Sequence, residues 1–175
     1  MSHKSLHEKP RTLLEQAEYN EEKGEIRIAG ADWILMRSAT FRDLIKEMER
    51  ILESGAVVIW LEAGRRAGKE FARTFLSEGM EPEEVPKLLE EFFTQGGWGN
   101  IQVKVNYTKK EAVVRIENSA TARQAKAKEP ICHFIRGYIA GICDAVFDTY
   151  TVCVETKCIA KGDAFCEFQI KEQNR

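Results

Sequence analysis

The fold is decided by residues 129–168, which read EPICHFIRGYIAGICDAVFDTYTVCVETKCIAKGDAFCEF and contain all five cysteines of the chain. Apolar residues recur at helical spacing after Pro130, a residue that suits the first turn of a helix. A β-hairpin is expected next, with residues 152–154 in one arm, a turn at residues 161–163 and residues 165–168 in the other arm. Three cysteines and one glutamate fall where the start of the helix and the two arms can meet: Cys132, Glu155, Cys158 and Cys166.

The motifs CHFIRGYIAGI and VETKCIAKGDAFCEF in this stretch resemble the 4-vinyl reductase domain family. That family is related to the sensor domains of bacterial regulators that respond to phenols and other aromatics. It is more distantly related to a eukaryotic vesicle-tethering subunit that holds an acyl chain. The resemblance is specific over residues 129–168 and looser over residues 24–118. It implies a ligand-binding domain in which Cys132, Glu155, Cys158 and Cys166 hold a structural zinc ion.

The chemistry of these four side chains agrees with that implication. Zinc takes four ligands in a tetrahedron, and four protein ligands leave no open position for a substrate. Glu155 and Cys158 are three residues apart, which places them on opposite faces of a regular strand, so the strand is expected to end or bulge before Cys158. The residues alone leave open that these are ordinary buried thiols. Cys143 and Cys153 are expected in the core, and His133 is expected to pack or cap locally.

Composition indicates one domain of ordinary soluble character. The chain has 175 residues, and we expect an N-terminal arm or docking helix at residues 1–23 and a single domain at residues 24–175. A balance of 26 basic against 28 acidic side chains excludes a general nucleic-acid partner. We expect no membrane span because no apolar run approaches the length that one needs. Cysteines without a secretion signal favour a reducing cytoplasm.

The remaining patterns predict an α+β fold: an antiparallel sheet of four or more strands packed with four to five helices. Short strands are expected at residues 24–28 and 33–36, helices at 40–52, 56–76 and 82–94, and a strand pair at 101–107 and 112–117. Glycine pairs at Gly64/Gly68 and Gly137/Gly141 imply that a helix backbone or a ligand is pressed close. The string from Gly64 to Lys69 fails as a phosphate loop because its spacing is one short and Glu70 stands where Ser or Thr is needed.

The resemblance implies an apolar pocket between helices and sheet, although most large aromatics must be core. The candidates for its lining are Trp60, Phe71, Phe92, Trp98, His133, Phe134 and Tyr138. We expect a module that binds a small apolar or aromatic molecule and reports it to an unknown output protein. Two alternatives stay open: a vinyl reductase or accessory protein of tetrapyrrole metabolism, although a G-x-G-x-x-G fingerprint is missing, and a structural dimer subunit. The resemblance also implies a homodimer, with Trp33, Leu35 and Phe41 as candidates for its surface.

Overall fold

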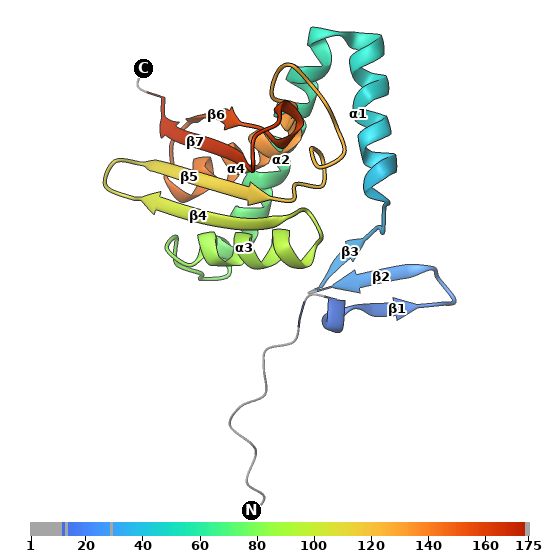
Figure 1. Ribbon diagram of the computed structural model, residues 1–175. Coiled ribbons are helices and arrows are strands. Elements are labelled where there is room, and N and C mark those ends of the chain that lie inside the picture. The colour runs from blue at the N-terminus through green and yellow to red at the C-terminus, as the bar shows by residue number, and fades with distance from the viewer. Residues whose placement is uncertain (1–11, 13, 29, 174–175) are drawn as a thin grey trace, which may run out of the picture. The chain divides into compact units, whose positions relative to one another are not determined.

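The computed structural model describes residues 12, 14–28 and 30–173 (Figure 1). The chain divides into two compact units, Met1–Met36 and Arg37–Arg175. The predicted N-terminal arm, residues 1–23, lies largely outside the described residues, so its boundary stays a prediction.

The first unit contains a three-stranded antiparallel sheet in the order β1-β2-β3. A single 3-10 turn (η1, Leu14–Gln16) precedes β1 (Glu18–Asn20), β2 (Glu25–Ile28) and β3 (Ala31–Trp33). Ile28 pairs with Ala31, so this turn closes at Gly30 rather than near Asp32. The strand expected at residues 33–36 therefore begins earlier and ends at Trp33, and Ile34, which follows it, is exposed.

The second unit contains four helices in its described residues: α1 (Ser38–Leu52), α2 (Ser54–Ser77), α3 (Val85–Gln95) and α4 (His133–Val146). The continuous helical interpretation of residues 56–76 is confirmed, and Pro86 lies in the first turn of α3 as its geometry favours. Two predicted helix starts are wrong. α1 begins two residues before Thr40, and α4 begins three residues after Pro130 because the backbone of Cys132 is not helical.

The sheet of the second unit has four antiparallel strands in the order β4-β5-β7-β6. These strands are β4 (Asn100–Asn106), β5 (Glu111–Glu117), β6 (Thr151–Lys157) and β7 (Cys166–Glu172), and a 3-10 turn (η2, Ile159–Lys161) lies between β6 and β7. Alternation along β5 buries Ala112, Val114 and Ile116 on one face. α4 packs on β6 and β7, and α2 packs on α4, as Figure 1 shows behind the strands. The α+β fold class is confirmed.

The two glycine pairs form the contact between α2 and α4. A Cβ atom at Gly64 would lie 2.9 Å from the backbone nitrogen of Tyr138, and one at Gly141 would lie 2.7 Å from that of Lys69. Real Cβ atoms do not come this close to backbone atoms, so only glycine allows the two helices to approach to this distance. Of the two explanations that the spacing left open, backbone packing is the one observed.

Candidate metal centre and aromatic cluster

The four predicted metal ligands meet at one buried point. Cys132 precedes the first turn of α4, Glu155 lies in β6, Cys158 follows that strand and Cys166 begins β7. One ligand atom from each of the four residues lies within 4.8 Å of the others. Glu155, the most exposed of the four, has a relative exposure of only 5%. The cluster therefore joins the start of the helix to both arms of the hairpin.

The local backbone explains how Glu155 and Cys158 reach the same side. The pairing of β6 with β7 shifts between Glu155 and Lys157, and β6 ends at Lys157. This irregularity confirms the expected bulge before Cys158 and brings the thiol and the carboxylate together. Cys158 is then held by its backbone N–H, which donates to Asp163 Oδ2 at 2.8 Å.

Two observations show that these residues fit a tetrahedral metal ion. Zinc–sulfur bonds of about 2.3 Å in a tetrahedron set two thiolates about 3.8 Å apart, and the sulfur atoms of Cys132 and Cys166 are 3.8 Å apart. Glu155 Oε2 accepts the backbone N–H of Cys132 at 3.0 Å, whereas its Oε1 is buried without a hydrogen-bond partner in the described part of the chain. A buried carboxylate oxygen without a partner is costly, and a cation would satisfy it.

The electrostatics of the cluster agree with this geometry. Hydrogen bonds to the Cys158 and Cys166 thiols, together with burial, raise the pKa of Cys132 well above its usual value. Burial, with the neighbouring Cys158, raises the pKa of Glu155 to about 8. Without a cation the four groups thus resist carrying charge together, and a bound divalent ion reverses that balance.

Hydrogen bonds from neighbouring groups fix two of the thiols. The hydroxyl of Thr121 donates to Cys132 Sγ at 3.4 Å, and the backbone N–H of Ile159 donates to Cys166 Sγ at 3.4 Å. Such outer contacts orient metal ligands and tune their basicity. The closed set of three thiolates and one carboxylate is suited to holding zinc as a structural ion, with no open position for chemistry.

A cluster of aromatic side chains lies farther along α4. Trp98 and Phe134 stack with ring centroids 5.9 Å apart, and Phe41 packs edge-on against Trp60, Trp98 and Phe134 at 5.5–5.7 Å. Phe71 contacts Phe92 at 4.7 Å and Tyr138 at 6.0 Å. Six of the seven candidates for the pocket lining therefore belong to one continuous set of ring contacts: Trp60, Phe71, Phe92, Trp98, Phe134 and Tyr138.

Two polar atoms near this cluster are buried without partners in the described part of the chain, Trp60 Nε1 and His133 Nδ1. The seventh candidate, His133, begins α4 beside Cys132, and burial is the main cause that lowers its pKa. Phe41 was expected on a dimer surface, and its contacts with three cluster rings show that this expectation is wrong. Its place on the apolar face of the first helix could have indicated this, because that face packs inward.

A pocket of about 250 Å³ lies elsewhere, between α1 and residues 121–131. None of the predicted lining residues borders it. The residues that do are mostly polar or small, and they follow no periodicity that a sequence pattern could detect: Arg42, Ile45, Lys46, Glu49, Thr121, Gln124, Ala125, Lys126, Ala127 and Ile131.

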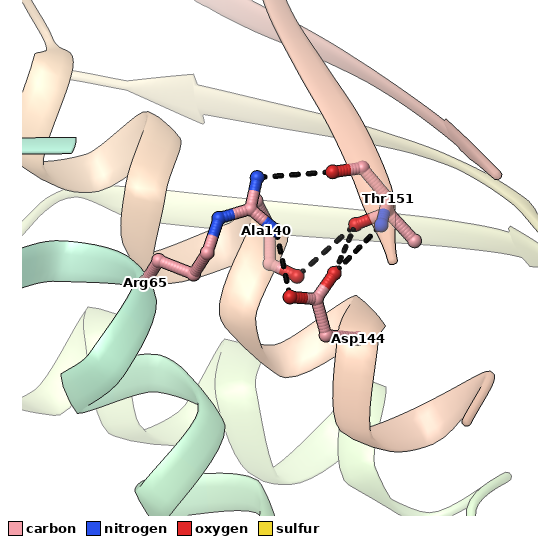
Figure 2. A network of polar contacts seen from close by, with 4 residues as sticks. All are labelled: Arg65, Ala140, Asp144 and Thr151. Atoms are coloured by element: carbon pink, nitrogen blue, oxygen red, sulfur yellow. Dashed lines mark hydrogen bonds and ion pairs between the residues drawn. The ribbon is translucent and has the colours of Figure 1, made fainter. Parts of the chain in front are cut away.

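A third polar constellation joins α2, α4 and the start of β6 (Figure 2). Arg65 Nη1 donates to Asp144 Oδ2 at 2.6 Å, and its Nη2 donates to the carbonyl of Thr151 at 2.9 Å. The backbone N–H and the hydroxyl of Thr151 both donate to Asp144 Oδ1 at 2.8 Å, and the hydroxyl also reaches the carbonyl of Ala140. Because each charged group is paired, the network acts as a structural junction, and the Gly64–Lys69 string lies within a helix rather than in a phosphate loop.

None of the helices in the described residues is long and apolar enough to cross a lipid bilayer.

Comparison with known proteins agrees with the predicted resemblance. Residues 112–172 match the model of the 4-vinyl reductase domain. The uncharacterized protein MJ0745 of Methanocaldococcus jannaschii is 32% identical over 124 residues, which are 71% of this chain and 61% of that protein. The chain thus spans under two thirds of that relative's length, and 62% of the length of a second relative from the same organism.

Three solved structures share the fold. The phenol-responsive sensory domain of the transcription activator PoxR, solved with phenol, has a TM-score of 0.70 at 20% identity and covers 91% of this chain and 86% of that one. A vinyl-4-reductase family protein of Methanocaldococcus jannaschii has a TM-score of 0.52 at 21% identity, over 83% of this chain and 100% of its own. A trafficking protein particle complex subunit 3 from Naegleria fowleri, covalently bound to palmitic acid, has 0.56 at 17%, over 78% and 93%.

The family match covers the strand β5, the whole of α4, the hairpin and all four residues of the metal cluster. Through residues 112–172, the chain therefore belongs to the 4-vinyl reductase domain family.

Proposed function

We propose that the chain is a sensor domain that binds a small aromatic molecule and is held in shape by a structural zinc ion. The observation that carries the ligand part is the unpaired indole N–H of Trp60 within the aromatic cluster. Aromatic faces offer an apolar site, and one buried donor without an acceptor favours a ligand that brings an acceptor oxygen. Phenol, the molecule in the PoxR sensory domain, has this chemistry.

The zinc part is supported by the buried set of three cysteines and Glu155. Its sulfur spacing and the unpaired carboxylate oxygen are what a closed tetrahedral site requires. In this proposal Cys132, Glu155, Cys158 and Cys166 bind the ion, and the ion ties α4 to the β6–β7 hairpin. It has no part in a reaction.

The proposal includes a homodimer formed through α1 and α2. Five large apolar side chains are exposed on these two helices: Leu44, Ile51, Leu52, Val58 and Ile59. α1 carries three basic and three acidic side chains, a balance that suits pairing with a second copy of itself across a two-fold axis. In light scattering at micromolar concentration, Ile51→Glu should convert a dimer into a monomer. A monomeric mass for the unaltered chain would remove this part of the proposal.

The ligand part is tested by pairing two probes with one conservative substitution. At about one hundred times Kd, a ligand of the folded state stabilises it by roughly 2.7 kcal/mol, which is visible in a thermal scan. Phenol should stabilise the protein more than toluene, and Trp60→Phe should remove that preference because it keeps a ring and loses the N–H. An unchanged preference in Trp60→Phe, or no shift with either compound, would contradict the proposal. Stabilisation by a nicotinamide cofactor with turnover of a vinyl substrate would favour the reductase alternative.

A further inference from the structure

The pocket between α1 and residues 121–131 has a chemistry of its own, apart from the aromatic cluster. Its apolar lining comes from Ile45 and Ile131, with two alanines beside them. Its polar lining comes from both walls: Arg42 and Lys46 lie on α1, and Lys126 lies on the facing segment. Three cationic groups thus surround a small apolar floor.

The guanidinium of Arg42 is held in place and still has hydrogen atoms to donate. Its Nη1 donates to the carbonyl of Ala120 at 3.0 Å, and its Nη2 donates to Gln124 Oε1 at 2.7 Å. A guanidinium has five N–H donors in a fixed plane, so these two bonds orient the group and leave further donors for an anion. A group positioned in advance loses little side-chain entropy when it binds a ligand.

One acidic side chain, Glu49, also lines the pocket. Burial raises its pKa, so the carboxyl gains a proton more readily than an exposed one and can then donate a hydrogen bond. A doubly charged oxyanion would be repelled by this carboxylate, whereas a singly charged one fits beside three cations. The size of the pocket, about 250 Å³, restricts the occupant to a compact molecule.

We propose that this pocket is a second small-molecule site, which binds a compact carboxylate with an apolar body such as an aromatic acid. The carboxylate lies against Arg42 and Lys46, and the apolar body lies on Ile45 and Ile131. This site goes beyond the proposed aromatic sensing, since it shares no lining residue with the aromatic cluster.

The wall of this pocket is also part of the surroundings of the metal cluster. Thr121 lines the pocket, and its hydroxyl donates to Cys132 Sγ at 3.4 Å. Ile131, on the same wall, is bonded directly to Cys132, whose N–H is held by Glu155. A ligand that orders this wall also orders two metal ligands, and linkage requires the effect to be reciprocal. Carboxylate binding should therefore raise the affinity for zinc.

The test uses benzoate as the probe on the zinc-loaded full chain, with binding followed by titration in NMR or calorimetry. Lys46→Met, which keeps the length of the side chain and removes its charge, should weaken benzoate binding severalfold. Lys104→Met on β4 is the matched control, since this exposed lysine lies outside the pocket, and it should have no effect. Equal weakening by both substitutions, or no benzoate binding to the unaltered chain, would overturn the site.

A second comparison separates this site from the aromatic one. Trp60→Phe should leave benzoate binding unchanged, and Lys46→Met should leave the phenol-induced thermal shift unchanged. Loss of benzoate binding in Trp60→Phe would place benzoate in the aromatic cluster and refute the second site. Competition with a chelator should show slower zinc loss when benzoate is present, and an unchanged rate would overturn the coupling to the metal.

Discussion

Gly68→Ala tests whether the contact between α2 and α4 requires glycine. A Cβ atom at this position would lie 2.8 Å from the carbonyl carbon of Tyr138 and 3.0 Å from its Cα, with the carbonyl oxygen closer still. All these atoms belong to the backbone of α4, so no side-chain rotation can relieve the clash. The two helices must separate.

The size of the effect follows from these distances. Non-bonded carbon atoms rest at about 3.5 Å or more, so α4 has to move by at least about 0.7 Å from a carbon now at 2.8 Å. Such overpacking costs about 1–3 kcal/mol, and the better helix propensity of alanine returns about 1 kcal/mol. We take the upper end of the cost, because the separation also opens the contacts at the other three glycines. The net loss is then about 2 kcal/mol.

For a chain of this length, a loss of about 2 kcal/mol lowers Tm by about 4–8 °C, which differential scanning calorimetry resolves easily. Gly55→Ala is the matched control in the same helix, because its Cβ would meet only Leu52 Cβ at an ordinary 3.9 Å. That variant should be as stable as the original or slightly more so. If Gly68→Ala is as stable as Gly55→Ala, the close-contact argument fails.

Two further predictions concern the polar junctions. The purified protein should carry about one zinc ion per chain, and Cys166→Ser should lose the metal and melt at a lower temperature because metal binding is coupled to folding; protein prepared without chelator that holds no metal by elemental analysis would contradict this. Arg65→Met should cost about 3 kcal/mol in denaturant unfolding, because it leaves the buried carboxylate of Asp144 without its cation. An equally large loss in Arg73→Met, whose ion pair is exposed, would show that the effect is not one of burial.

The sequence predicts the helices, the strands and the metal cluster for a physical reason. Periodicity of apolar residues reports which face of an element is buried, and it is strong in α1, α2 and β5. The four ligands are found because their spacing is local to one helix start and one hairpin. Helix starts were harder to predict. Arg37 precedes α1 without a side-chain cap, and Cys132 precedes α4 in a conformation that depends on Glu155, a residue distant in the chain.

The pocket beside α1 could not be predicted in this way. Residues 118–128 have the polar and small side chains of a loop, yet Ser119 and Thr121 are buried. They can be buried because their hydroxyls pair with each other at 3.0 Å and Thr121 also reaches Cys132. Such burial results from tertiary contacts rather than from periodicity, so the walls of a pocket built on this segment leave no pattern in the sequence.

The placement of these features along α4 bears on how binding could be reported. Cys132 at its start belongs to the metal cluster, Phe134 and Tyr138 to the aromatic cluster, and Asp144 near its end to the junction with Arg65. The glycine contacts leave no gap between α4 and α2, and the buried ion pair joins the two helices a second time. A ligand that displaces Phe134 must therefore move α2 together with α4, since close-packed interiors transmit displacement rather than absorb it. α2 continues into the exposed apolar surface that it shares with α1, which is the proposed contact with a second copy. We therefore expect phenol binding to alter dimer affinity, and Gly68→Ala, which separates the helices, to weaken that dependence.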